Sequence, residues 1–208
     1  MQEIQAYHGT KNSNINSILE NGFNLSLSTN QRTHWLGKGI YFFEDLYYAV
    51  EWNFCCRRKL MTYEELSKEY GIIVVRIDIE NYNILDLNSG LGYDIYRTIT
   101  NKIKPFCDEE DIVKLENYGD IKIIRIIEKI EEKTGISLIS QFDIVSALYP
   151  KNIYKKQNEH VGDFFVGIQR QICVKNEKAI IKKEKYENEQ DKLKKIYNLI
   201  AMNRRKKW

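Results

Sequence analysis

The chain has 208 residues, of which 43% are hydrophobic and 29% are charged, and its formal net charge is +3. This length and hydrophobic content allow a substantial buried core, and one domain with an insertion or a tail accounts for them. No apolar run approaches the length needed to cross a bilayer, and the N-terminal residues lack the basic and hydrophobic regions of a secretion signal. We therefore expect a cytoplasmic protein without a membrane segment.

Cysteine and histidine do not form a metal-binding pattern in this sequence. No two cysteines have C-x-x-C spacing, no histidine lies at zinc-ligand spacing from them, and the three histidines are scattered. We therefore expect reduced, mostly structural thiols and no metal site. The cysteines are Cys55, Cys56, Cys107 and Cys173.

The first motif joins a strand to a short helix. His8-Gly9-Thr10 follows an apolar start and is typical of a strand end, where a glycine allows the backbone to approach a ligand closely. Apolar residues then recur at helical spacing over residues 15–19, with Ser13 or Asn14 as the candidate N-cap. Asn21-Gly22 supplies the glycine expected just past a helix end.

A second strand and helix follow. Gly37-Lys38-Gly39 introduces the aromatic run Ile40-Tyr41-Phe42-Phe43, which has the composition of a strand. Residues 46–54 then have a helical pattern over Ala49, Val50 and Trp52.

Together these segments resemble the NAD-binding core of the poly(ADP-ribose) polymerase-like, or diphtheria-toxin-like, ADP-ribosyltransferases. In that superfamily an H-G-[ST] strand, a helix ending in G-[LF], and a G-K-G-I-Y-F segment followed by a helix build the nicotinamide pocket. The close resemblance covers residues 6–54, and a weaker one covers residues 161–180. It implies a bacterial member with NAD as substrate and an α+β fold. The implied fold is a split β-core of two mostly antiparallel sheets with flanking helices and a helical insertion.

The superfamily uses a His-Tyr-Glu triad, and the resemblance implies roles for the first two members. His8 would bind the adenosine-side ribose hydroxyl of NAD, and the backbone of Gly9 would pair with the nicotinamide amide. Tyr41 matches the tyrosine that stacks on the nicotinamide ring. Trp52 falls where a second aromatic residue covers the other ring face, and two aromatic faces suit a cationic pyridinium.

Four further residues fall at family positions around NAD. Thr10 takes the small hydroxyl position beside the histidine, and Gly39 lies in the turn before the tyrosine. Asn14 falls where the family often has a polar residue near the adenine ribose, and Asn24 falls where an arginine sometimes lies. The resemblance thus implies that Thr10, Asn14 and Gly39 belong to the NAD-binding set.

The third triad position departs from the family. Gln171-Ile172-Cys173-Val174 aligns with the family's E-[YF]-[IV]-V in a late, alternating strand, so Gln171 stands where a glutamate is expected. That glutamate binds the ribose 2'-hydroxyl and stabilises the oxocarbenium-like charge that develops as nicotinamide leaves. A glutamine keeps the hydrogen bond without the charge, which fits a divergent transferase, a binding-only protein or an inactivating substitution. We favour divergence, and chain elongation is not expected.

Ordinary structural roles are the alternative for each of these residues. His8 before a glycine can cap a turn, and Tyr41 and Trp52 can be core aromatics. Gln171 can be a solvent-facing strand residue, with Gln169 on the same strand face.

Outside the motifs, the hydrophobic pattern predicts further elements. Residues 71–79 predict a central strand, residues 82–87 extend or follow it, and residues 141–145 predict another short element. Residues 93–135 are charged and helical, which predicts a helical insertion packed on the sheet. The apolar stripe of this insertion consists of Ile121, Ile124, Ile127 and Ile130.

Residues 150–162 predict a polar loop before the Gln171 strand. In related transferases the segment before the triad glutamate helps to choose the acceptor. By that analogy the acceptor-selecting residues are Lys151, Tyr154, Lys155, Lys156 and His160.

The C-terminal segment is basic. Residues 175–208 hold twelve Lys or Arg and five Asp or Glu, a balance of +7, which leaves −4 for the remainder of a +3 chain. An apolar stripe from Leu193 to Ile200 predicts an amphipathic helix over residues 182–203. We expect a transferase-like domain over residues 1–181 and a basic helix and tail over 182–208, which either packs on a partner or contacts nucleic-acid phosphates.

Two functions of different classes follow. The first, which we favour, is a mono-ADP-ribosyltransferase acting as a bacterial toxin or phage-defence effector, with nucleic acid slightly favoured over protein as acceptor. An antitoxin or inhibitor protein would be the partner of such a toxin. The second is a module that binds NAD, ADP-ribose or RNA ends, which the neutral Gln171 favours. RNA 2'-phosphotransfer on the same fold would need further basic pocket residues that the sequence does not identify.

Overall fold

The computed structural model describes residues 2–28, 35–55, 62–116, 123–151, 167–187 and 190–205, and the chain in them is α+β. The strands are β1 (Glu3–Lys11), β2 (Ile40–Phe43), β3 (Tyr70–Asp78), β4 (Ile84–Asp86), β5 (Ile144–Lys151), β6 (Gly167–Val174) and β7 (Ile180–Lys185). The α-helices are α1 (Asn12–Asn21), α2 (Leu46–Cys55), α3 (Tyr63–Glu69), α4 (Gly90–Ile103), α5 (Glu109–Glu116), α6 (Ile123–Thr134) and α7 (Gln190–Arg205).

The described strands are assigned to one mixed sheet in the order β4-β5-β6-β2-β1-β3-β7. β4 runs parallel to β5, whereas the pairs β1–β2, β1–β3, β3–β7 and β5–β6 are antiparallel. The resemblance implied two sheets. Among the described strands a single sheet is found instead, because each strand is hydrogen-bonded to the next in this order.

The chain divides into two compact units. Unit 1 comprises Met1–Phe23, Phe42–Glu80 and Ile180–Trp208, and unit 2 comprises Asn24–Tyr41 and Asn81–Ala179. The N-terminal His-Gly-Thr motif and the part of the basic C-terminal segment from Ile180 onward therefore belong to unit 1, while the Gly-Lys-Gly turn and the Gln171 strand belong to unit 2.

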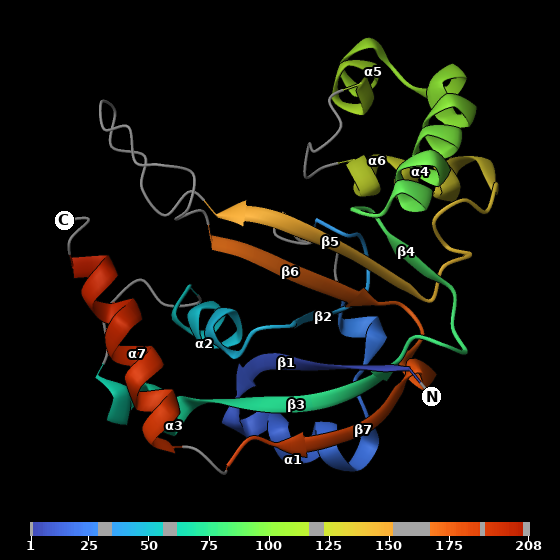
Figure 1. The fold of residues 1–208 in the computed structure, drawn as a ribbon. Helices are drawn as coiled ribbons and strands as arrows, with labels where there is room; N and C mark the ends of the chain where they lie inside the picture. The colour runs from blue at the N-terminus through green and yellow to red at the C-terminus, as the bar shows by residue number, and fades with distance from the viewer. Residues whose placement is uncertain are drawn as a thin grey trace. The chain divides into compact units, whose positions relative to one another are not determined.

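Unit 1 is organised around β3, which lies between β1 and β7 (Figure 1). Glu3 to Lys11 of β1 pair in unbroken antiparallel register with Asp78 to Tyr70 of β3. The predicted strand over residues 71–79 is confirmed, and its buried residues Ile72, Ile73 and Val75 explain the hydrophobic signal.

The predicted start and end of the first helix differ in accuracy. Gly22 has φ 86° and its N–H bonds to the Ile18 carbonyl at 3.0 Å, so the glycine stop is confirmed. Neither Ser13 nor Asn14 is the N-cap. β1 leads directly into α1, and the N-cap is Lys11, whose side chain makes no capping hydrogen bond.

The C-terminal segment contains a strand as well as a helix. The helix predicted over 182–203 is wrong at its start, because Lys182 to Lys185 belong to β7 and pair with β3. Main-chain pairing with β3 outweighs the helix preference of this Lys- and Glu-rich stretch. From Gln190 onward α7 is helical, and it contacts α2 and α3 (Figure 1).

The apolar stripe of α7 closes the core of unit 1. Tyr197 and Ile200 are buried, and Leu193 and Ile196 pack against the same cluster, which also contains Ala49 and Val50 of α2. The predicted amphipathic face is therefore confirmed, and it packs on this chain.

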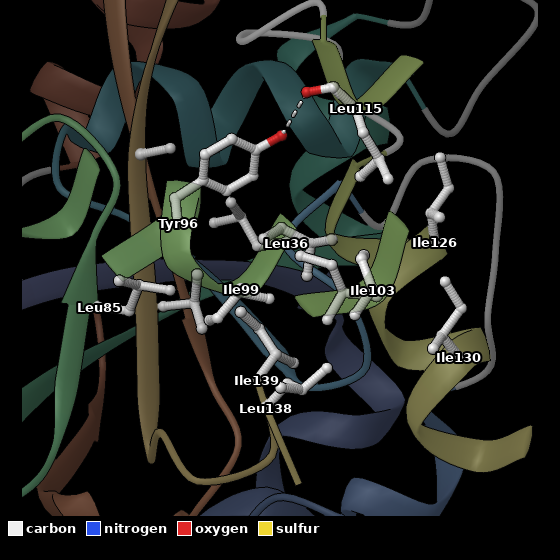
Figure 2. Close-up of a cluster of buried hydrophobic side chains, with 14 of the residues drawn as sticks. Leu36, Leu85, Tyr96, Ile99, Ile103, Leu115, Ile126, Ile130, Leu138 and Ile139 are labelled. Carbon is white, nitrogen blue, oxygen red and sulfur yellow. Dashed lines mark hydrogen bonds between the residues drawn. The ribbon is translucent and has the colours of Figure 1, made fainter. Parts of the chain in front are cut away.

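Unit 2 combines β4, β5 and β6 with α4, α5 and α6. Its core joins buried strand residues such as Val145 and Cys173 to the apolar faces of the helices. Figure 2 shows part of this core in close-up, with Leu85 of β4 and with Ile99 and Ile103 of α4 among the labelled side chains. The Tyr96 hydroxyl on α4 donates to the Leu115 carbonyl on α5 at 3.2 Å, so the two helices are joined by a buried hydrogen bond (Figure 2).

The helical pattern predicted over residues 93–135 corresponds to α4, α5 and α6. Three of the four stripe residues, Ile124, Ile127 and Ile130, are buried as expected, and Ile121 lies outside the described residues. Among the helices of the described ranges, none has both the length and the apolar character that a bilayer crossing requires.

Candidate functional site

His8 stands in β1 within a cluster of three rings. Its imidazole meets the Phe23 ring edge-on with centroids 5.2 Å apart, and the Phe42 ring at 5.7 Å. Phe23 and Phe42 also meet edge-on at 5.2 Å. The turn at Gly22 places Phe23 against His8, so the histidine and the Gly-Phe pair of the motif are linked by packing.

Gly9 allows α2 to pack directly on β1. A side-chain Cβ at this position would lie 2.5 Å from the Ala49 carbonyl oxygen and 2.6 Å from Asn53 Oδ1. The glycine therefore has a packing role in unit 1, and the expected contact of its backbone with nicotinamide stays a prediction.

Asn53 is a feature of this region that the sequence reasoning missed. The residue is buried, and its Nδ2 donates to the Gly71 carbonyl at 3.2 Å. Its Oδ1 has no hydrogen-bond partner within the described ranges, although it lies against Gly9. The available signal was a single amide side chain within the largely apolar α2 sequence LYYAVEWNFC. An amide on the buried face of such a helix needs hydrogen-bond partners, so its position indicates a special role.

The remaining NAD-binding residues expected in unit 1 lie in ordinary surroundings. Thr10 is half-buried opposite Gly71 in β3, and Asn14 is exposed on α1. Trp52 is half-buried and packs against the core of unit 1, with its ring 6.3 Å from that of Phe43. A packing role is thus shown for Trp52, while stacking on nicotinamide stays a prediction.

In unit 2, Tyr41 closes the turn that precedes it. Its hydroxyl accepts a hydrogen bond from the Leu36 amide at 2.7 Å and donates one to the Gly37 carbonyl at 2.8 Å. The ring is half-buried and packs against the core of unit 2. Because side chains alternate along a strand, Tyr41 leaves β2 on the face opposite to Phe42.

The same turn is fixed at Gly39. Ser28 Oγ accepts from the Gly39 amide at 2.7 Å and donates to its carbonyl at 2.9 Å. A Cβ on Gly39 would lie 2.4 Å from Cys173 Sγ, so the turn lies directly on β6. The expected role of Gly39 in NAD binding stays a prediction, and its close approach to β6 is a structural reason for the glycine.

Cys173 is a buried, protonated thiol. Burial raises its pKa to about 12, and its Sγ lies 3.7 Å from the Lys38 carbonyl oxygen. The thiol is therefore neutral at physiological pH, consistent with the expected structural role for cysteine.

Gln171 lies two residues earlier on the same face of β6. It is opposite Ala147 of β5 and only 6% exposed, so the solvent-facing alternative is wrong. Its Oε1 is enclosed and finds no hydrogen-bond donor among the described residues. Burying an amide oxygen without a donor is unfavourable, and a ligand hydroxyl would supply the missing donor.

Other expected positions contribute less to this site. The Asn24 side chain accepts from the Ser26 amide at 2.9 Å and so caps a short 3-10 turn. Tyr154, Lys155, Lys156 and His160 lie outside the described residues, as does the side chain of Lys151. No group of His, Cys, Asp and Glu in the described ranges could hold a metal ion.

Comparison with known proteins finds a similarity for the N-terminal motifs. Residues 1–67 match the model of the poly(ADP-ribose) polymerase catalytic domain. This match contains His8, Gly9, Tyr41 and Trp52, and it ends before Gln171. It supports the resemblance to the poly(ADP-ribose) polymerase-like ADP-ribosyltransferases for this part of the chain.

One curated relative spans nearly the whole chain. An uncharacterized protein of Methanocaldococcus jannaschii is 29% identical over 199 residues, which cover 88% of this chain and 87% of that protein. No solved structure matches the chain.

Proposed function

We propose that this chain is an NAD-dependent mono-ADP-ribosyltransferase. The observation that carries the proposal is the match of residues 1–67 to the poly(ADP-ribose) polymerase catalytic domain, because this segment contains both the His-Gly-Thr strand and the GKGIYF segment. In the reaction, the bond between nicotinamide and the ribose C1' breaks and nicotinamide leaves with the electron pair. An acceptor oxygen or nitrogen then bonds to C1' and loses its proton.

Three residues divide the work of the proposed site. His8 binds the adenosine-side ribose, with its ring orientation fixed by Phe23 and Phe42. Tyr41 stacks on nicotinamide, with its hydroxyl already engaged by the turn before it. Fixed side chains lower the cost of ordering the site when NAD binds.

Gln171 would accept a hydrogen bond from the ribose 2'-hydroxyl. Its enclosed Oε1 without a donor supports this role, because the hydroxyl would satisfy it. A neutral amide stabilises an oxocarbenium-like transition state less than a carboxylate does. We therefore propose single transfer of ADP-ribose and no polymer growth.

We propose a nucleic acid as the acceptor. Residues 175–208 carry the +7 charge balance, and exposed lysines occur on both β7 and α7. Clustered positive charge attracts polyphosphate chains regardless of sequence. This balance already counts the acidic partners of two lysines, since Lys182 pairs with Glu184 at 3.0 Å and Lys185 pairs with Glu187 at 2.7 Å.

The test is release of nicotinamide from NAD by the purified chain, alone and with RNA, DNA or lysate protein. We expect release to depend on the nucleic-acid pool and to fall at least about tenfold in His8→Ala. Gln171→Leu should lower it about a hundredfold, the loss typical of one transition-state hydrogen bond. Gln169→Leu is the matched control on the same strand face and should change it little.

A second candidate is a module that binds NAD or ADP-ribose without cleaving it, which the neutral Gln171 favours. Saturable NAD binding, without release of nicotinamide in the presence of any acceptor pool, would establish this function and contradict the transferase. Release that appears only in Gln171→Glu would show that the third triad position limits the chemistry.

A further inference from the structure

Two buried charges outside the expected site meet beneath the Gly37–Gly39 turn. Glu128 on α6 and Lys175, just after β6, form an ion pair with Nζ and Oε1 2.5 Å apart, and their side chains are only 8% and 13% exposed. Few ion pairs are buried to this degree, because each charge loses most of its hydration.

Both charges also bind the main chain of the turn. The carboxylate of Glu128 accepts from the Lys38 amide at 2.8 and 3.0 Å, and Lys175 Nζ donates to the Lys38 carbonyl at 3.0 Å. The peptide groups on either side of Lys38 are therefore each fixed by one member of the ion pair.

The Glu128 carboxylate occupies the space that a side chain on the first glycine of the turn would need. Gly37 has φ +86°, and a Cβ there would lie 2.1 Å from Glu128 Oε1. A side chain at residue 37 would therefore displace Glu128 in addition to straining the backbone.

The Gly37–Gly39 turn determines where the Tyr41 side chain lies. The Tyr41 hydroxyl bonds to the Leu36 amide and the Gly37 carbonyl, which are part of the segment held by Glu128. Lys175 follows the strand that carries Gln171 by one residue, and Cys173 of that strand contacts the Lys38 carbonyl. The ion pair thus connects the turn before Tyr41 to the strand of Gln171, within unit 2.

We infer that Glu128 and Lys175 are positioning residues for the NAD-cleaving site, setting the place of Tyr41 relative to Gln171. The inference rests on the proposed transferase function and extends it to two residues that would contact neither NAD nor acceptor. Their action is indirect, because the partners of their side chains among the described residues are the main chain of the turn and each other.

The chain supplies a matched control on the same turn and the same helix. The Lys38 side chain pairs with Glu132, one helical turn beyond Glu128, but these side chains are 49% and 59% exposed. This pair leaves the main chain of the turn untouched. Glu132→Gln should therefore change NAD cleavage less than twofold.

The experiment compares Glu128→Gln, Lys175→Met, the double variant and Glu132→Gln. Nicotinamide release gives kcat and KM, and thermal unfolding gives the midpoint temperature. We expect each single variant to lower kcat/KM by roughly 10- to 100-fold, the loss that follows a small displacement of a binding group. Both single variants should also unfold at lower temperature, because one buried charge is left unpaired.

The double variant separates positioning from stability. Replacing both buried charges by neutral groups should restore the midpoint temperature toward that of the wild type. Activity should stay at least about tenfold low, since the Lys38 carbonyl still lacks its donor. Activity that returns together with the midpoint temperature would show a purely structural pair and overturn the inference.

Failure of the inference and failure of the proposed function are distinguishable. If the wild type releases nicotinamide and the single variants stay within twofold of it, the positioning role is overturned and the transferase stands. If the wild type releases none with any acceptor, the transferase is overturned, and the inference with it.

Discussion

The two parts of the motif region are held by different forces. In unit 1, His8 is held by the rings of Phe23 and Phe42, and Gly9 is held by close packing of α2. In unit 2, the turn before Tyr41 is held by a buried ion pair and hydrogen bonds to the main chain. The first arrangement depends on shape, and the second depends on charge.

The two arrangements use residues from different parts of the sequence. Ring packing is satisfied by residues close to the motif, within the segment that matches the polymerase catalytic domain. The ion pair consists of Glu128 and Lys175, which lie far outside that segment. The His8 side should therefore respond mainly to changes of volume, and the Tyr41 side mainly to changes of charge.

Phe23→Ala should produce the largest loss of stability. Phe23 is 6% exposed, and truncating a buried phenylalanine typically costs about 3–5 kcal/mol in free energy of unfolding. Denaturant unfolding measures this loss. Leu27→Ala is the control, because Leu27 is 73% exposed and its truncation should cost less than about 0.5 kcal/mol. Equal losses in the two variants would contradict the ring cluster.

Gly37→Ala should produce the next largest loss, on the charged side of the comparison. The left-handed backbone costs an alanine about 1–2 kcal/mol, and displacing Glu128 from its donors adds about 1–3 kcal/mol. Gly135→Ala is a matched control, because Gly135 also has positive φ, +72°, with nothing within 4 Å of a Cβ. Only the backbone cost should remain there, and a loss equal to that of Gly37→Ala would remove Glu128 from the explanation.

The local parts of this structure could be predicted from sequence, whereas the distant contacts could not. The strand over residues 71–79, the stop at Gly22 and the apolar face of α7 all follow from short-range patterns. Glu128 and Lys38 are 90 residues apart, and nothing in the local pattern around residue 128 distinguishes it from neighbouring acidic residues. The β7 pairing was missed for the same reason, because a partner strand far away overrides local propensity.

Within the candidate site, the sequence proposes residues but does not show what surrounds them. Gln171 is predicted from the resemblance of its segment to the family's E-[YF]-[IV]-V strand, and the structure adds that it is buried without a donor for its Oε1 among the described residues. For Gly9 the structure shows a packing role that the residue pattern could not reveal, and for Trp52 it shows the packing that the core-aromatic alternative predicted. Packing depends on which helix face meets which strand, and a single sequence leaves that open.

The Cys173 thiol predicts a smaller effect, which depends on pH. Its pKa is raised to about 12 by burial, whereas an unfolded thiol ionises at about pH 8.5. Between these values the unfolded state loses its proton and the folded state keeps it, so stability must fall as pH rises. The loss at pH 10 should be about 2 kcal/mol relative to pH 8. Denaturant unfolding of the wild type and of Cys173→Ala at both pH values gives the change in the free energy of unfolding for each protein. The wild type should lose more stability than Cys173→Ala, and equal losses would contradict a buried neutral thiol.

Salt should separate the two ion pairs of the turn, with the smallest expected effect. The exposed pair of Lys38 and Glu132 should contribute at most about 0.5 kcal/mol, and high salt should remove that contribution because a Debye length shrinks to about 3 Å at 1 M. Dissolved ions have little access to the buried pair of Glu128 and Lys175, because these side chains are only 8% and 13% exposed. The stability difference between wild type and Glu132→Gln should therefore vanish at 1 M salt, whereas that of Glu128→Gln should persist. If both differences vanish together, solvent reaches the buried pair, and charge would no longer explain how the turn before Tyr41 is held.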